Sequence, residues 1–151
     1  MRRIESATGY NYFMSRRYQA IEQICKKYGV KALYGFGSRG RELFEVLRDD
    51  RLSLSASQSD LDIGVLTHSP FSVDDKVGLT SDLEGLFGNA NVDLVVLQEV
   101  DAFLAANIIR GERVYAEDDY LADEYELFVL RRAGDLAGFE RQRMAAILEE
   151  S

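Results

Sequence analysis

The hydrophobic residues of this chain recur at two spacings, one typical of helices and the other typical of strands. Apolar residues three or four positions apart predict helices over residues 12–28, 42–48, 72–87, 100–109, 121–129 and 136–148. Short apolar segments rich in β-branched residues predict strands over residues 30–36, 60–67, 92–97 and 113–115. Between residues 49 and 59 the chain is polar, rich in serine and without periodicity, which predicts a loop.

The order of these elements predicts an α+β fold of α/β type, in which a small mixed β-sheet is flanked by helices. With 151 residues, the chain is expected to form one domain over residues 1–151, with an N-terminal helix and a C-terminal helical extension. Hydrophobic residues make up 46% of the chain, which is enough for a packed core.

Two of the predicted strands carry aspartates among apolar residues. Asp60 and Asp62 are two positions apart, so they project from the same face of one strand, about 6.5–7 Å apart. Asp93 lies in the next apolar strand, between Val92 and Leu94. Aspartate is unfavourable in strands, and carboxylates held close together repel each other unless a proton or a cation lies between them. If the two strands are neighbours, the three side chains form a cluster that calls for a functional explanation.

Such a carboxylate cluster suits a hard divalent cation. Mg²⁺ fits best, because it is usually bound by a few carboxylates together with substrate phosphates. Two such ions stabilise the attacking and leaving oxygens of an in-line displacement. We therefore interpret Asp60, Asp62 and Asp93 as candidate metal-binding and catalytic residues. The structural alternative is that Asp60 begins the strand, Asp62 faces solvent and Asp93 pairs with an arginine.

The first predicted strand ends in Gly37-Ser38, directly before a predicted helix. Small residues at this position let backbone N–H groups approach a phosphate, and the N-terminus of a helix favours anions. The Ser38 hydroxyl can donate a further hydrogen bond, and Arg39 can neutralise an outer phosphate. Gly37, Ser38 and Arg39 are therefore predicted to bind a nucleotide.

Taken together, the Gly-Ser pair, the Asp-x-Asp motif and the later strand aspartate resemble the nucleotidyltransferase superfamily typified by DNA polymerase β. The chain is most similar to its minimal, MNT-type members, and the similarity is strongest over residues 30–100. The resemblance implies a polymerase β-like fold and transfer of a nucleoside monophosphate, in particular AMP from ATP, with two Mg²⁺ ions. It implies that Asp60 and Asp62 bind both ions, and that Asp93 completes the catalytic metal site and takes the proton of the attacking hydroxyl. It also implies that Gly37 and Ser38 hold the triphosphate.

Minimal members of this size resemble MntA-like antitoxins of HEPN/MNT toxin–antitoxin systems. The resemblance implies a HEPN ribonuclease toxin as the partner and a tyrosine of that toxin as the acceptor of AMP. The chain departs from the usual pattern in the 21 residues between Ser38 and Asp60, about twice the common number, and in Gly40, where alanine is usual. The additional residues, near 45–57, lie beside the expected phosphate site.

Charge and composition narrow the class of partner and compartment. The net charge is −8, but residues 1–31 carry +5 and the remainder −13. An acidic surface opposes broad nucleic-acid binding, which requires Lys and Arg, yet it permits nucleotide binding through metal ions. No apolar run approaches the roughly 20 residues needed to span a bilayer, and the N-terminal residues lack the apolar region of a signal peptide. The chain is therefore expected to make no membrane contacts. Cys25 is the single cysteine, which excludes an internal disulfide and indicates a cytoplasmic protein.

Three functions remain open at this point. The first is transfer of AMP to a protein hydroxyl, with a hetero-oligomer of transferase and toxin. The second is a non-catalytic antitoxin that neutralises its partner by binding, and the presence of all three aspartates favours the first over it. The third is transfer to a small molecule, but such enzymes usually carry an additional helical domain for which this chain has little room. His68 is the single histidine and is predicted to lie in a loop.

Overall fold

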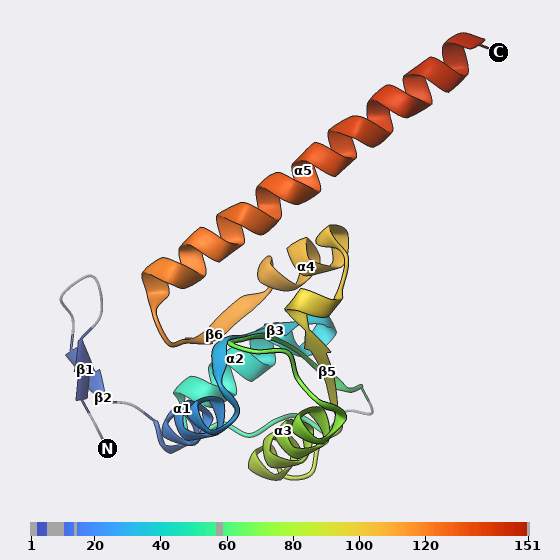
Figure 1. Cartoon of the computed structure of the whole chain (residues 1–151). Helices are drawn as coiled ribbons and strands as arrows, with labels where there is room; N and C mark the ends of the chain where they lie inside the picture. Colours follow the sequence, from blue (N-terminus) through green and yellow to red (C-terminus); the bar gives the residue numbers. More distant parts are fainter. Residues whose placement is uncertain (1–2, 6–10, 14, 57–58, 151) are drawn as a thin grey trace.

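A four-stranded sheet forms the centre of the computed structural model, which describes residues 3–5, 11–13, 15–56 and 59–150 (Figure 1). The strand order is β5-β4-β3-β6. The strands are β3 (Val30–Phe36), β4 (Leu61–Thr67), β5 (Val92–Val96) and β6 (Glu112–Ala116). The helices are α1 (Arg16–Tyr28), α2 (Gly40–Arg48), α3 (Val73–Leu86), α4 (Ala102–Ile109) and α5 (Asp119–Glu150). Two short 3-10 turns, η1 (Gly37–Arg39) and η2 (Leu97–Glu99), follow β3 and β5, and β1 (Arg3–Glu5) pairs with β2 (Asn11–Phe13) in a separate ribbon.

The sheet is mixed, as the sequence predicted. Strand β3 runs antiparallel to both β4 and β6, whereas β4 and β5 are parallel. Parallel neighbours need a crossover connection, and α3 supplies it between β4 and β5. The arrangement is an α+β fold with helices on both faces of the sheet.

The alternation of side chains along the strands divides the core into two layers. Leu33, Ile63 and Val65 face α1, α2 and α3, where they pack with residues such as Ile21 and Leu79. The other face carries Ala32, Tyr34 and Leu66, which pack against α4 and α5. Figure 1 shows α4 and α5 on one side of the sheet and α1 and α3 on the other.

Helix α4 lies very close to β4. A Cβ atom added to Gly64 would stand 2.5 Å from Cγ2 of Ile108, so only glycine allows this approach. Asp62, Gly64 and Leu66 are two positions apart along β4, so they project from the same face of the strand. Asp62 therefore projects from the face of the sheet that α4 and α5 cover.

The helices differ most from the prediction at two places. Helix α1 begins at Arg16 rather than at residue 12, because the Ser15 side chain accepts a hydrogen bond from the Tyr18 N–H and caps the helix there. The two helices expected over 121–129 and 136–148 are one helix, α5, of 32 residues. Gly134 lies between them but costs only about 1 kcal/mol in a helix interior, which is too little to end the helix.

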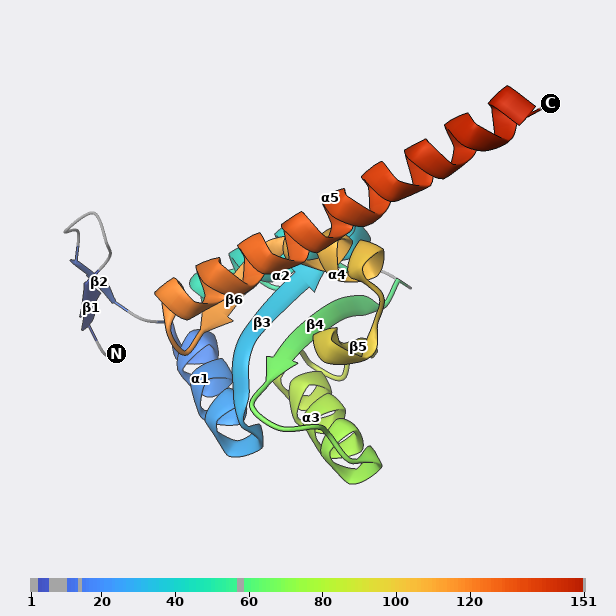
Figure 2. The same cartoon turned by 45° about the horizontal axis from the view of Figure 1, so that its top comes forward.

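Helix α5 is longer than the sheet that it covers. At 1.5 Å per residue its 32 residues span about 48 Å, and Figure 2 shows its C-terminal part projecting beyond the sheet. Ala122, Val129 and Ala133 are buried in its first half. In the second half Leu136, Phe139 and Leu148 are exposed.

In the part of the chain that the structure describes, no helix combines the length and the apolar character that a membrane crossing requires.

The start of the loop between α2 and β4 is fastened to α1. The Arg17 guanidinium donates from one Nη1 to the carbonyl oxygens of Val46, Asp49 and Leu52, at 3.0, 3.2 and 2.6 Å. The carboxylate of Asp50 accepts the backbone N–H groups of Arg16 and Arg17 at the N-terminus of α1, at 2.8 and 3.3 Å. Negative charge is favourable at that end of a helix, so these contacts stabilise both the loop and α1.

Candidate active site

The register of the sheet brings Asp62 and Asp93 together. The two residues are Cα partners in the parallel pairing of β4 with β5, and adjacent strands lie about 4.8 Å apart. Across the antiparallel pairing on the other side of β4, Phe36 is the partner of Asp62. Asp93 is two positions before Val95 and therefore projects from the same face of β5. Val95 packs in the layer formed with α4 and α5, so Asp93 and Asp62 lie on the same face of the sheet. The strand register thus brings these two carboxylates close together, as the sequence predicted.

Asp60 lies one residue before β4 rather than inside it, because the strand pairing begins at Leu61. The Leu61 N–H donates to the Asn91 carbonyl oxygen at 2.8 Å and starts the contact with β5. Asp60 and Asp93 are exposed, whereas Asp62 is half-buried. Burial raises the pKa of Asp62, and the nearby charges of Asp93 and Asp60 raise it further. The three carboxylates are therefore close enough to repel one another.

Gly37 packs directly against Asp62. Its φ angle is +69°, in the left-handed region that favours glycine. A Cβ atom at Gly37 would stand 2.2 Å from Oδ2 of Asp62, so a side chain at this position collides with the carboxylate. The turn that carries Gly37 and Ser38 thus lies beside Asp62, and Ser38 is exposed in that turn, before the N-terminus of α2.

The arrangement fits a divalent cation by the chemistry of its donors, although the side chains do not already enclose one. Among the described residues, no group of three or more His, Cys, Asp or Glu side chains could hold a metal ion as it stands. Within the same ranges, none of the ion pairs formed by Lys or Arg involves Asp60, Asp62 or Asp93. Two neighbouring carboxylates without a cationic partner form an incomplete donor set, which Mg²⁺ completes with water and phosphate oxygens.

Arg39 is placed differently from the prediction that it neutralises an outer phosphate. Its side chain is buried, with 6% of its surface exposed. Its Nη1 donates to the Ser59 carbonyl oxygen at 3.0 Å, and its Nη2 donates to the Ser55 carbonyl oxygen at 3.0 Å. Nε and Nη2 also donate to the two carboxylate oxygens of Glu42, at 3.3 and 3.2 Å. All three guanidinium nitrogens thus have partners in the protein.

Glu42 was not predicted as part of the site, yet it completes this network. Besides binding Arg39, its carboxylate accepts the backbone N–H of Ser55. The hydrogen bond from Arg39 and that from the Ser55 backbone together lower the pKa of Glu42 to about 2. The three-residue spacing from Arg39 to Glu42 is typical of side-chain pairs on helices, and this was the available signal.

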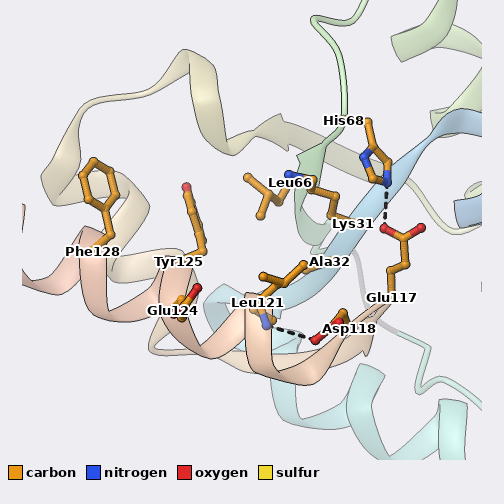
Figure 3. Close-up of a pocket in the computed structure, with 11 residues that line it drawn as sticks. Lys31, Ala32, Leu66, His68, Glu117, Asp118, Leu121, Glu124, Tyr125 and Phe128 are labelled. Atoms are coloured by element: carbon orange, nitrogen blue, oxygen red, sulfur yellow. Dashed lines mark hydrogen bonds and ion pairs between the residues drawn. The ribbon is translucent and has the colours of Figure 1, made fainter.

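A separate pocket of about 340 Å³ lies under α5 (Figure 3). Ala32, Leu66 and Tyr125 are among the residues that line it, and His68 stands at its rim, where Nε2 lies 2.7 Å from Oε2 of Glu117. Leu66 is four residues beyond Asp62 on β4, about 13 Å along the strand. His68 is an exposed loop residue, as predicted, and lies away from the carboxylate pair.

A comparison with protein families decides the identity of this fold. The family model described as "Polymerase beta, Nucleotidyltransferase" matches residues 19–120, which is more than half of the chain. This chain belongs to the polymerase beta nucleotidyltransferase family. All the residues predicted to form the site lie within the part that matches the family. A search of curated proteins finds no match.

Solved structures with a similar fold confirm the polymerase β-like architecture. A chain of a toxin–antitoxin complex with AMP-PNP superposes with a TM-score of 0.59, at 18% identity over 87% of this chain and 96% of its own. A chain of the tri-AMPylated Shewanella oneidensis HEPN toxin in complex with MNT antitoxin gives a TM-score of 0.56, also at 18% identity, over 91% and 98%. A chain of the MntA–HepT toxin–antitoxin gives 0.55 at 18% identity, over 88% and 95%. At this level of identity the similarity shows the fold.

Replacing Gly37 with alanine should destabilise the fold more than the same change at Gly88. Both glycines have φ close to +68°, so each substitution incurs the backbone strain of about 1–2 kcal/mol. At Gly88 no described atom lies within 4 Å of an added Cβ, whereas at Gly37 that atom overlaps Oδ2 of Asp62. We expect a further loss of about 1–3 kcal/mol for Gly37→Ala in urea denaturation. Equal losses for the two variants would contradict the contact between Gly37 and Asp62.

Replacing Glu42 with Gln should reduce the dependence of stability on acid. The pKa of Glu42 is about 2 in the folded protein and 4.5 in an ordinary setting. The carboxylate therefore stabilises the native state above about pH 4.5, and this contribution is lost as the pH falls toward 2. The free energy of unfolding of Glu42→Gln should be lower than wild type by about 1–3 kcal/mol at pH 7, with the two converging near pH 2.

Glu45→Gln is the matched control, because Glu45 forms an exposed ion pair with Arg41 on the same helix. It should change the free energy of unfolding by less than about 1 kcal/mol at any pH in this range. If Glu42→Gln differed from wild type by the same amount at pH 2 and at pH 7, the network around Glu42 would not be electrostatic.

Proposed function

We propose that this chain transfers AMP from ATP to a hydroxyl group of a protein, with Mg²⁺, and that it is an antitoxin that modifies a HEPN ribonuclease toxin. The observation that carries the proposal is the pairing of Asp62 with Asp93 across two strands, together with the contact of the Gly37 turn with Asp62. Membership in the polymerase beta nucleotidyltransferase family supports assigning these residues to a site for nucleotidyl transfer. Residues 1–151 act as one minimal nucleotidyltransferase domain in the cytoplasm, which supplies ATP.

In this proposal Asp60, Asp62 and Asp93 hold the divalent cations, and the turn at Gly37 and Ser38 binds the triphosphate. When bound, Mg²⁺ supplies positive charge that offsets the carboxylates and stabilises the oxygens of the phosphoryl group being transferred. The backbone N–H groups of the turn and the N-terminus of α2 favour the phosphates in the same place. These residues orient the α-phosphate of ATP toward the acceptor.

We assign to Asp93 the role of receiving the acceptor's proton, which the resemblance to polymerase β-type nucleotidyltransferases implies. Its side chain is exposed, so an incoming hydroxyl can reach it, whereas that of its neighbour Asp62 is half-buried. The hydroxyl oxygen forms a bond to the α-phosphorus as the bond from that phosphorus to the pyrophosphate oxygen breaks. The hydroxyl proton passes to the carboxylate of Asp93, and the products are the AMP ester of the acceptor and pyrophosphate.

The proposed partner is supported by the similar solved structures and by the charge of the chain. One similar structure is a complex of an MNT antitoxin with a tri-AMPylated HEPN toxin, and another contains AMP-PNP. The chain carries +5 over residues 1–31 and −13 over the remainder, and we propose the basic segment 1–31 and the acidic segment 112–126 for docking. Electrostatic complementarity of this kind mainly accelerates and orients association. We therefore place a tyrosine of the partner, or another of its hydroxyl groups, beside Asp93.

Incubation of this chain with ATP, Mg²⁺ and the HEPN protein encoded by the adjacent gene should increase the mass of that protein by one or more AMP groups. Asp93→Asn should reduce the transfer at least about 100-fold, since it removes the proton acceptor. The complex with the partner should remain intact, because asparagine keeps the size of the Asp93 side chain and the change leaves the charged segments proposed for docking as they are. Intact-protein mass spectrometry measures the modification, and size-exclusion chromatography measures the complex.

Two results would contradict this function. If the wild type binds the partner but never modifies it with any nucleoside triphosphate, the chain is a non-catalytic antitoxin. If AMP is transferred equally well by Asp93→Asn, the proton acceptor lies elsewhere.

A further inference from the structure

Asp60 is the one member of the carboxylate cluster that the sheet does not hold. Asp62 and Asp93 are fixed by the paired strands β4 and β5, but that pairing begins at Leu61. Asp60 follows the long segment between α2 and β4, over residues 49–59, and is exposed. Another contact must therefore fix the peptide that carries it.

We propose that Arg39 is a positioning residue, which holds Asp60 in the geometry needed for metal binding by fixing the peptide that precedes it. The inference rests on the proposed function and adds to it a residue whose side chain binds neither the metal nor the nucleotide.

The decisive contact is the hydrogen bond from Arg39 Nη1 to the Ser59 carbonyl oxygen, at 3.0 Å. That carbonyl belongs to the same planar peptide as the N–H of Asp60. The hydrogen bond from Arg39 therefore fixes the peptide before Asp60. The peptide after Asp60 is fixed by the Leu61 N–H, which donates to the Asn91 carbonyl oxygen at 2.8 Å. The backbone of Asp60 is thus fixed from both directions although the residue lies outside the strand.

The planar guanidinium is needed because its acceptors lie in three places. Arg39 reaches the carbonyl oxygens of Ser55 and Ser59 and the carboxylate of Glu42 at the same time, from a buried position. Glu42 also accepts the Ser55 N–H, so the end of the segment is held by both of these side chains. A lysine ammonium is a compact point charge, and it lacks the fork of donors that spans such acceptors.

The same residue joins the two halves of the site. Arg39 is the last residue of η1, the turn that contains Gly37 and Ser38. Its backbone therefore belongs to the phosphate-binding turn, while its side chain holds the peptide of the first carboxylate. Arg17 fastens the start of the segment to α1 by three carbonyl contacts, so both ends of the long loop are fixed.

Substitution of a phosphate ligand and substitution of a positioning residue have different effects on nucleotide binding and on metal affinity. Loss of a phosphate ligand weakens nucleotide binding with or without metal. Loss of a group that positions a metal-binding carboxylate weakens the affinity for the metal and leaves metal-free nucleotide binding unchanged. Groups that orient metal ligands typically change metal affinity by about 10- to 100-fold when they are mutated.

The test compares Arg39→Lys with Arg51→Lys. Arg51 is in the same segment and binds the carboxylate of Asp49 through Nε and Nη2, but its side chain is 89% exposed. Isothermal titration of Mg²⁺ into each protein, saturated with AMP-PNP, gives the apparent Kd for the metal. Arg39→Lys should raise this Kd about 10- to 100-fold, and Arg51→Lys should leave it within about twofold of wild type. Metal-free binding of AMP-PNP should be equal in all three proteins.

Two further measurements complete the test. Glu42→Gln keeps the shape of the side chain but removes the charge that holds Arg39, so it should raise the Kd for Mg²⁺ in the same direction. It decides the question if Arg39→Lys fails to fold by circular dichroism. Asp60→Asn should also lose Mg²⁺ affinity, and adding Arg39→Lys to it should have little additional effect, because both changes act on the same ligand.

An unchanged Kd for Mg²⁺ in folded Arg39→Lys would overturn the inference. An equal loss of metal-free AMP-PNP binding would also overturn it, since Arg39 would then be a phosphate ligand. If the wild type and Asp60→Asn bind Mg²⁺ equally weakly in the presence of AMP-PNP, the proposed function itself fails, and the inference fails with it.

Discussion

The parallel pairing of β4 with β5 places two negative charges next to each other, and much of the structure serves to maintain this pairing. Asp62 and Asp93 are partners in the register, so their repulsion is built into the sheet. The α3 crossover makes the parallel pairing possible, and Gly64 allows α4 to cover the same face. Gly37 then brings a backbone turn against Asp62. Folded proteins keep such unfavourable arrangements mainly at functional sites, and in the proposed function a bound cation would compensate for this one.

The sequence was most informative where a short periodicity determines structure. Strand β3 has the predicted bounds, and the alternation in residues 60–67 correctly put Asp62 on one face and its apolar neighbours on the other. A mixed sheet in an α+β fold was also predicted correctly. Local spacing could not give the register of Asp62 with Asp93, because the register depends on how the α3 crossover returns the chain to the sheet.

Contacts that are distant in sequence account for what was missed. Arg39 was predicted to face phosphate, but its acceptors are backbone carbonyl oxygens 16 and 20 residues away, which side-chain identity does not reveal. Asp60 was placed inside the strand, yet pairing begins one residue later, at Leu61. The break expected within α5 is absent because no proline accompanies Gly134 and a single glycine is tolerated in a helix interior, so the helix continues.

The long segment between α2 and β4 need not disturb the site, since its length is compensated by contacts at each end. Arg17 anchors its start and Arg39 anchors its end, directly before Asp60. Loop closure becomes only slightly less favourable as a loop lengthens, so an insertion of this kind has a small effect on stability once its ends are fixed. Only the end of the segment, at Ser59, directly precedes a carboxylate of the proposed site, and the strands hold Asp62 and Asp93 independently of it.

A crystal structure of the wild-type chain with Mg²⁺ and AMP-PNP would test most directly whether Asp62 and Asp93 bind metal together with the nucleotide. We expect a Mg²⁺ ion between the two carboxylates, with Mg–O distances of about 2.0–2.1 Å, and phosphate oxygens of the nucleotide completing its coordination. The triphosphate should lie against the Gly37 turn. Well-ordered AMP-PNP bound elsewhere, with Asp62 and Asp93 free of metal, would contradict it.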